Sequence, residues 1–427
     1  MADVSSTVHG LKPTPEQVEW QRMRLGVFFH FGLNTFHGLE WGPGTIPASD
    51  FAPADLDAGQ WVATAAELGA KYVVITAKHH DGFCLWPTAT TDYSVTSSPW
   101  RQGRGDVVRE VADACARFGL RFGFYLSPWD RNAPQYADPA AYDDFYEAQL
   151  RELCTNYGEV AEIWFDGAGS EGHVYAWDRF VKVIQELQPR AMVFNMGAPT
   201  IRWVGNEDGV ASDPVDYVVS RSDFSNYTVD TVEYEQALYL PPECDVSIRR
   251  GWFWAQDDAP KSLDHLLAIV YASIGKGANL LLNLPPDSRG RIPAEDVARL
   301  RELRVELDRR FGAPISGVAT PVESSTEWTD WAVDFGDPLS FDHLLLEEDL
   351  LDGQRVEAFE VEIDGDTVAV GPRIGAQRIV VFPERSAASV VVRVRGGGAR
   401  LRPVTAFRTG VPDIPLIEYV APTDAPE

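Results

Sequence analysis

The sequence predicts an α/β protein made of repeated strand–helix units, followed by a smaller antiparallel β domain. The chain has 427 residues, too many for one small domain and enough for a barrel of strand–helix repeats with a second unit. Short runs rich in Val, Ile and aromatic residues alternate with amphipathic stretches up to about residue 311. Beyond Gly312 the helical periodicity disappears, and short segments alternate apolar and polar residues. We therefore expect two domains, residues 1–314 and residues 315–427.

The strands of the first unit are expected to be parallel and buried on both faces, because their apolar runs are continuous rather than alternating. The runs expected to form strands are Leu25–Phe31, Lys71–Thr76, Arg121–Leu126, Ala161–Phe165, Ala191–Phe194, Tyr217–Val219 and Ala278–Leu284. The stretches predicted to be helices are Gln60–Leu68, Val107–Phe118 and Arg299–Phe311. Gly69 and Gly119 follow the first two of these helices, and glycine commonly ends a helix.

The second unit is expected to contain short antiparallel strands. Val356–Ile363 and Ala388–Val394 alternate apolar and polar residues, as a strand with one buried face does. The segments are separated by the turn sequences Asp352-Gly353, Asp364-Gly365 and Gly396–Gly398. Helix periodicity is lost throughout this part of the chain, so a small antiparallel β domain is the simplest account of it.

Composition excludes several classes of partner. The formal net charge is −27, which opposes binding to phosphate backbones and to anionic lipid surfaces, so we expect neither nucleic acid nor membrane as a partner. The four cysteines are scattered, and four buried thiols are the expectation. The first ten residues have neither a basic start nor an apolar core, so we expect no signal peptide and a cytoplasmic protein, or a secreted one if a leader has been removed. The oligomeric state stays open.

Carboxylates, imidazoles and indoles follow the predicted strands. In a barrel of strand–helix repeats the working groups lie at the carboxyl ends of the strands, so these side chains should meet at one rim. The residues that close or follow successive runs are His30, Glu40, Trp41, His79, His80, Tyr125, Trp164, Asp166, Arg202 and Glu207. Such residues suit a sugar, because hydroxyls need polar partners and the apolar face of a pyranose needs an aromatic ring. Cleavage of a glycosidic bond needs two carboxyl groups, one ionised and one protonated.

Several segments together resemble the α-L-fucosidases of glycoside hydrolase family 29. They are Leu25–Asn34, Glu40-Trp41, Ile75–Val95, Ile163–Gly167, Ile201–Gly209 and Ser247–Trp254, and the resemblance covers about Trp20 to Pro286. The tract from Val318 to Thr409 is similar to the β-sandwich that follows the barrel in that family. The resemblance therefore implies a (β/α)8-like barrel of the TIM type, then an antiparallel β-sandwich, in a retaining glycoside hydrolase that removes α-L-fucose.

The resemblance also implies roles for individual residues. Asp166 would be the nucleophile that forms a covalent fucosyl-enzyme, and Glu207 would be the general acid that later activates water. Trp252 would face the methyl group of the sugar, and Arg202 would lie near the acid. The residues that match positions holding the fucose hydroxyls and ring are His30, Glu40, Trp41, His79, His80, Tyr125 and Trp164.

The segment Arg202–Glu207 (RWVGNE) is similar to the branch of the family that prefers α-1,3 and α-1,4 fucosyl linkages, so a fucosylated oligosaccharide or glycoconjugate is the expected substrate. Other functions stay open at this point: a transfucosylase, an α-L-galactosidase, a metal-dependent hydrolase, and a fucose-binding protein without catalysis. We expect no metal and no cofactor. His79 and His80 should point in opposite directions as they leave a strand, which makes joint binding of one ion awkward.

Each assignment has a structural alternative. An aspartate after a strand, such as Asp166, is often the N-cap of a helix. A glutamate in a loop, such as Glu207, is usually only solvated. A lone histidine on an aromatic strand is often a core residue with satisfied hydrogen bonds, which applies to His30. Trp164 and Trp252 could equally serve core packing.

Overall fold

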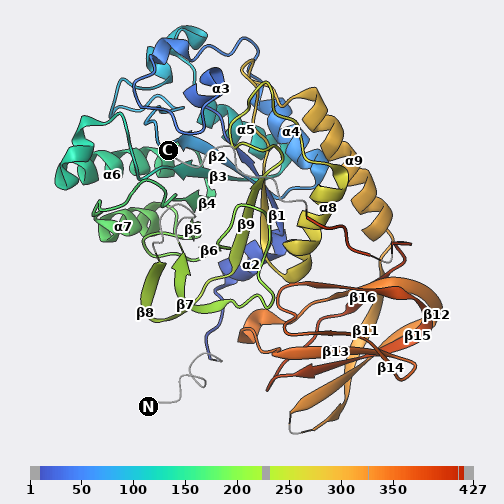
Figure 1. The fold of residues 1–427 in the computed structure, drawn as a ribbon. Helices are drawn as coiled ribbons and strands as arrows, with labels where there is room; N and C mark the ends of the chain where they lie inside the picture. Colours follow the sequence, from blue (N-terminus) through green and yellow to red (C-terminus); the bar gives the residue numbers. More distant parts are fainter. Residues whose placement is uncertain (1–9, 224–230, 326, 412, 418–427) are drawn as a thin grey trace.

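The computed structural model describes residues 10–223, 231–325, 327–411 and 413–417. Most of the N-terminal segment on which the expectation of no signal peptide depends, residues 1–9, lies outside this range. Within it, a barrel of parallel strands is surrounded by helices, and a separate antiparallel β unit packs against one end (Figure 1). No helix among the described residues is long and apolar enough to cross a membrane.

Eight parallel strands form a nearly closed barrel, which confirms the expected fold class. The order around the sheet is β5-β4-β3-β2-β1-β10-β9-β6. A parallel bridge between Phe194 and Ile201 connects the two edge strands. The strands are β1 (Leu25–Phe29), β2 (Tyr72–Lys78), β3 (Arg121–Leu126), β4 (Val160–Trp164), β5 (Met192–Phe194), β6 (Arg202–Trp203), β9 (Pro242–Ser247) and β10 (Asn279–Asn283).

Two barrel strands were not anticipated, and one expected strand lies elsewhere. The expectation that Tyr217–Val219 belongs to the parallel sheet was wrong: β7 (Val218–Asp223) pairs antiparallel with β8 (Thr231–Tyr239) as a separate ribbon. β6 contains two residues, too few for a pattern. β9 has polar residues at alternate positions, including Glu243 and Asp245, which are nevertheless buried inside the barrel.

Helices cover the outside of the barrel. Gly69 and Gly119 end α4 and α5 in the left-handed conformation with φ of 100° and 72°, which confirms both predicted helix ends. The helices are α2 (Pro15–Met23), α3 (Leu33–His37), α4 (Ala58–Leu68), α5 (Val107–Phe118), α6 (Pro139–Asn156), α7 (Trp177–Leu187), α8 (Leu263–Ala272) and α9 (Ala294–Phe311). Single 3-10 turns are η1 (Ala48–Asp50), η2 (Val95–Ser97), η3 (Trp100–Gly103), η4 (Pro134–Ala137), η5 (Ile274–Lys276) and η6 (Leu350–Asp352).

The amino-terminal end of the barrel is closed by α2. Trp20 on this helix is buried and its Nε1 donates to Glu162 Oε2 at 2.8 Å. Gln17 Nε2 donates to the carbonyl oxygens of Thr200 and Tyr239, both at 2.7 Å. Above the helix, Phe28, Tyr72 and other large side chains fill the barrel interior. The space left for a ligand is therefore at the carboxyl end of the strands.

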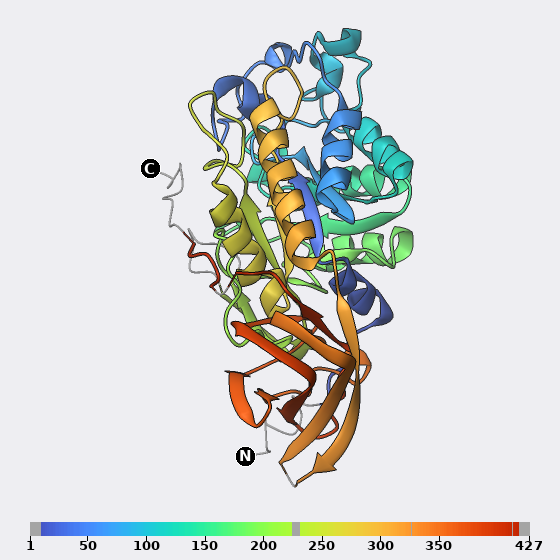
Figure 2. The same cartoon turned by 90° about the vertical axis from the view of Figure 1, so that its right-hand side faces the viewer.

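The C-terminal unit is the expected β-sandwich with its own core. Its strands are antiparallel in the order β11-β16-β12-β15-β13-β14, and β11 also pairs with β12. β12 and β15 are long, and their pairing shifts register twice along its length. Figure 2 shows this unit below the barrel, beyond the end of α9. Its strands are β11 (Ile315–Ser324), β12 (Trp328–Leu346), β13 (Ala358–Ile363), β14 (Asp366–Gly371), β15 (Arg378–Arg395) and β16 (Val404–Phe407).

Buried polar contacts join the two units. Tyr271 on α8 lies with its hydroxyl 2.8 Å from His343 Nε2 on β12, and Arg310 Nη1 on α9 donates to the same hydroxyl at 3.2 Å. The Tyr217 hydroxyl accepts the amide of Ala376 at 2.8 Å. The four cysteines are buried and unpaired, as expected.

Candidate active site

A cavity of about 650 Å³, including its open mouth, lies at the carboxyl ends of the barrel strands. It gathers side chains that are far apart in the sequence. Its lining residues are Phe28, His30, Glu40, Trp41, His79, His80, Trp164, Asp166, Gly167, Ala168, Phe194, Asn195, Trp203, Glu207, Asp245 and Trp252. Nine of the eleven residues named from the sequence are on this lining, and Tyr125 reaches it through a hydrogen bond to Asp166.

Asp166 follows β4 and is held by donors on both carboxylate oxygens. Its Oδ1 accepts the backbone amide of Ala168 at 2.8 Å, and its Oδ2 accepts the Tyr125 hydroxyl at 3.0 Å. His80 Nε2 lies 3.5 Å from the same Oδ2. Burial alone would raise the pKa of Asp166, but the interactions with His80, Ala168 and Tyr125 outweigh it and hold the pKa below its ordinary value. No helix starts until α7, so Asp166 is not a helix N-cap.

Glu207 lies in the loop after β6, on the wall of the same cavity. Trp252 Nε1 donates to Glu207 Oε2 at 3.3 Å. Burial of the carboxyl group raises the pKa of Glu207 to about 7, and the negative charge of Asp166 adds to this effect. One cavity therefore holds an acid that ionises easily and an acid that keeps its proton near neutral pH. General acid catalysis beside a carboxylate requires this combination of one ionised and one protonated carboxyl group.

Glu40 joins the loop after β1 to the loop after β9. Its Oε2 accepts the amide of Trp252 at 2.9 Å, and its Oε1 accepts the amide of Phe253 at 3.3 Å. A Cβ atom at Gly251 would lie 2.3 Å from Glu40 Oε1, so a larger residue at this position would require the carboxylate to move. The carboxylate of Glu40 thereby positions the indole that contacts Glu207.

The environments of His30 and His79 place the ring hydrogen on different nitrogens. His30 Nδ1 lies 2.9 Å from Asn283 Oδ1, whose amide nitrogen donates to the Trp252 carbonyl at 2.8 Å. His79 Nδ1 lies 3.4 Å from Asn34 Nδ2, a group that only donates. Burial lowers the pKa of His30 to about 3 and that of His79 well below its ordinary value. Both rings are therefore neutral, with the hydrogen on Nδ1 of His30 and on Nε2 of His79.

The expected opposite orientation of His79 and His80 was wrong. Both rings line the cavity, with centroids 4.2 Å apart. The physical reason is that β2 ends at Lys78, so the alternation of a strand does not extend to these two residues.

Arg202 is not brought to the cavity. Its guanidinium donates to the carbonyl oxygens of Trp203 and Asp216, both at 3.1 Å. Trp203, the next residue on β6, has its indole in the cavity lining instead. Alternate residues of a strand face opposite sides, which accounts for the difference.

Several lining residues were missed by sequence reasoning, and Asp245 is the most notable. It lies on β9, where its Oδ1 accepts Trp203 Nε1 at 2.7 Å. Burial, followed by the charges of Glu207 and Glu243, raises its pKa well above the ordinary value. In the sequence, the alternation of the polar residues Glu243, Asp245 and Ser247 is the pattern from which this strand could have been predicted. The structure shows that all three are buried.

Comparisons with known proteins agree on one family. Residues 44–305 match the family model described as Alpha-L-fucosidase. The chain is 37% identical over 414 residues to "Alpha-L-fucosidase 1" of Arabidopsis thaliana, covering 87% of this chain and 81% of the relative. It is similar to the structure of a glycoside hydrolase 29 family member from an unknown rumen bacterium, with a TM-score of 0.82, 35% identity and coverage of 94% and 78% of the two chains.

A second structure, a GH29 fucosidase from Ruminococcus gnavus solved in complex with fucose, superposes with a TM-score of 0.80 at 27% identity. That match covers 93% of this chain and 95% of the other. The family match spans most of the barrel, and the structural matches extend to the β-sandwich. The chain therefore belongs to the α-L-fucosidase family, glycoside hydrolase family 29, and is a glycoside hydrolase.

Proposed function

We propose that this chain is a retaining exo-α-L-fucosidase that hydrolyses terminal α-1,3- or α-1,4-linked L-fucose by double displacement. Asp166 is the nucleophile and Glu207 the general acid/base. The observation that carries this proposal is the contrast between two carboxyl groups of one cavity. The pKa of Asp166 is lowered, while that of Glu207 is raised to about 7.

In the first step an oxygen of Asp166 forms a bond to the anomeric carbon as the bond to the glycosidic oxygen breaks. Glu207 gives its proton to the departing oxygen, so the aglycone leaves as an alcohol. In the second step Glu207, now a carboxylate, takes a proton from water while the water oxygen bonds to the anomeric carbon. The bond to Asp166 breaks, and fucose leaves with its original configuration.

Polar and aromatic groups of the cavity suit a single deoxy sugar. His30 Nε2 is an acceptor and His79 Nε2 a donor, so the two rings complement sugar hydroxyls of opposite hydrogen-bonding roles. The aromatic rings of Phe28 and Trp252 offer apolar surface for the methyl group. We assign the sugar contacts to His30, Glu40, Trp41, His79, His80, Tyr125, Trp164 and Trp252. Arg202 is left out because its guanidinium is engaged with backbone carbonyls.

Replacement of the nucleophile tests the proposal directly. Asp166→Gly should abolish release of fucose, because the covalent intermediate cannot form. Azide should restore turnover partly and yield fucosyl azide, since it occupies the space of the missing carboxylate. Asp144→Asn, at an exposed carboxyl group on α6, is the matched control and should keep full turnover. Full activity of Asp166→Gly would refute the assignment.

Substrate and linkage are tested by a panel of fucosylated trisaccharides compared with a nitrophenyl fucoside. We expect fucose release from α-1,3- and α-1,4-linked branches, with NMR showing the α anomer as the first product. Release of the β anomer would contradict a retaining mechanism. Transfer of fucose to a second sugar as the main reaction would favour a transfucosylase.

A further inference from the structure

The Ser127 hydroxyl lies behind His80 and has only one hydrogen to give. Its Oγ lies 2.6 Å from the carbonyl oxygen of Trp129 and 2.7 Å from His80 Nδ1. A carbonyl oxygen can only accept, so the hydroxyl hydrogen points to Trp129. The contact with His80 is therefore satisfied only if His80 Nδ1 carries a hydrogen and donates it to Ser127.

The other ring nitrogen of His80 faces the carboxylate of Asp166. Nε2 lies 3.5 Å from Asp166 Oδ2, which also accepts the hydroxyl of Tyr125. A neutral ring with its hydrogen on Nδ1 would present a lone pair to a carboxylate oxygen, which is repulsive. A second hydrogen on Nε2 replaces this repulsion with a charge-assisted contact.

The other groups that face His80 are compatible with a cationic ring. The indoles of Trp41 and Trp129 have centroids 5.5 and 5.1 Å from the imidazole, within the range of cation–π attraction. His79 is neutral, and the Tyr125 ring lies 6.4 Å away. Two other cations lie nearby: Lys78 Nζ pairs with Asp130 Oδ2 at 2.9 Å, and Arg131 Nη1 donates to the carbonyl oxygen of Gly42 at 3.0 Å while its guanidinium lies over the Trp129 ring, 5.2 Å from the ring centroid. The neighbouring acid Asp81 has a pKa raised to about 7 by burial.

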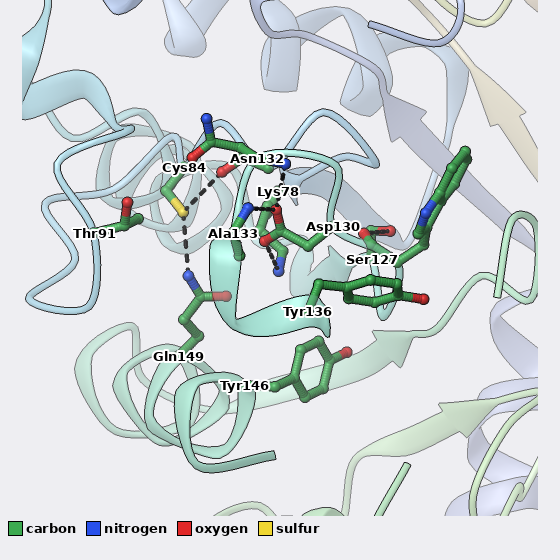
Figure 3. Close-up of polar contacts among 12 residues, drawn as sticks. Lys78, Cys84, Thr91, Ser127, Asp130, Asn132, Ala133, Tyr136, Tyr146 and Gln149 are labelled. Atoms are coloured by element: carbon green, nitrogen blue, oxygen red, sulfur yellow. Dashed lines mark hydrogen bonds and ion pairs between the residues drawn. The ribbon is translucent and has the colours of Figure 1, made fainter. Parts of the chain in front are cut away.

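The segments that carry Ser127 and His80 are fixed by a buried ion pair. Lys78 precedes His80 by two residues, and Asp130 lies on the same loop as Ser127 (Figure 3). Asp130 Oδ1 also accepts the amides of Asn132 and Ala133, at 3.0 and 2.8 Å. The ends of β2 and β3 are thus clamped together beneath the cavity, which holds the Ser127–His80 contact in place.

We propose that Ser127 is a positioning residue that holds His80 as an imidazolium ion paired with the nucleophile Asp166. The effect of this ion pair on catalysis rests on the proposed function. When Asp166 bonds to the anomeric carbon it loses its negative charge, while His80 keeps both hydrogens. When that bond breaks in the second step, the carboxylate charge returns beside the imidazolium, which favours departure of Asp166. No proton moves from His80 in either step.

The protonation state of His80 can be read by NMR without any turnover. In protein labelled with ¹⁵N-histidine at pH 7, we expect His80 to show two protonated ring nitrogens, while His30 and His79 each show one. Loss of the signals in His80→Gln assigns them. Ser127→Ala should shift His80 toward a neutral ring with its hydrogen on Nε2, and Ser127→Thr should restore the wild-type pattern. Ser98→Ala, which removes another buried hydroxyl, is the control and should change nothing.

Enzyme kinetics and mass spectrometry provide a second test. In Ser127→Ala the acid limb of kcat/KM should move up by about one pH unit, because Asp166 loses part of the positive charge beside it. Fucosyl-enzyme should accumulate severalfold in intact-mass spectra, and threonine should reverse both effects. A wild-type His80 with an unprotonated Nδ1 would overturn the proposal, as would an unchanged spectrum in Ser127→Ala. Absence of fucose release would overturn the proposed function alone, because the NMR pattern does not depend on it.

Discussion

At the scale of single residues, the proposed role of Glu207 as general acid predicts how the rate depends on pH. Its pKa of about 7 is that of a group which is protonated below neutrality and becomes unable to give a proton above it. We expect a bell-shaped profile of kcat/KM whose alkaline limb lies near pH 7. Glu207→Gln should remove this limb and lower kcat by about 10²- to 10⁴-fold for substrates with poor leaving groups. An unchanged alkaline limb in the variant would show that another group, such as Asp245, supplies the proton.

Sequence reasoning could find the site residues that directly follow an apolar run. His30, His79 and Asp166 are of this kind, because the end of each strand could be located within one or two residues. Asp245 and Trp203 could not be found this way, since the strands that carry them give no apolar signal. The opposite orientation predicted for His79 and His80 failed because it assumed that a strand geometry continues beyond its last hydrogen-bonded residue.

At the scale of elements, polar side chains inside the barrel limited what could be predicted. β1, β2, β3, β4 and β10 are buried and apolar, so their runs are visible in the sequence. β9 is equally buried but contains Glu243, Asp245 and Ser247. These residues are stabilised by partners on other strands, and a single segment of sequence does not reveal such partners.

Glu162 on β4 and Glu243 on β9 form a buried acidic pair. Burial and the charge of Glu243 raise the pKa of Glu162 well above its ordinary value, and burial also raises that of Glu243. At this pair the folded protein therefore binds more protons than the unfolded chain above about pH 4.5, the ordinary value for glutamate. The contribution of the pair to stability should fall as pH rises from that point until the folded-state pKa is passed.

Glu162→Gln should remove this loss, because the amide has no proton to lose and its oxygen can still accept Trp20 Nε1. The expected gain in the free energy of unfolding is at most about 1.4 kcal/mol for each pH unit over which Glu162, but not Glu243, remains protonated in the folded protein. Melting temperatures from pH 5 to 9 measure it. A variant whose melting temperature falls with pH as steeply as the wild type would contradict the expectation.

A buried ion pair joins the segment that follows β9 to α9. Arg249 is fully buried, and its Nε and Nη2 donate to the two oxygens of Asp296, at 2.9 and 2.8 Å. Asp296→Ala should lower the free energy of unfolding by about 3–5 kcal/mol, because it leaves the guanidinium without its main partner. The double variant Arg249→Met, Asp296→Leu should recover most of this loss. Urea unfolding measures both, and a loss below about 1 kcal/mol in the single variant would refute the argument.

At the scale of the whole molecule, the net charge of −27 should make stability depend on salt. Repulsion among excess carboxylates destabilises the compact state, and added ions screen it. We expect the melting temperature at neutral pH to rise between about 10 and 150 mM NaCl, where the Debye length falls from about 30 to 8 Å. Sorbitol at matched osmolarity is the control for non-ionic effects. A melting temperature that falls with NaCl would show that the surface ion pairs dominate instead.

The division of the chain into two units was visible in its sequence, because the periodicity changes where α9 ends at Phe311 and β11 begins at Ile315. What joins the units was not visible. The contacts of Tyr271 with His343 and of Tyr217 with Ala376 link residues 72 and 159 positions apart, and neither pair has a local signature.

The closure of the amino-terminal end of the barrel by α2 leaves the carboxyl ends of the strands as the side from which the cavity is entered. In the proposed double displacement both products would leave by this side, the alcohol first and the sugar after water has entered. Free sugar would then compete with the next substrate for the same position. An alcohol that stays bound at the mouth of the cavity would compete with water instead, so its residence time there would set the balance between hydrolysis and transfer.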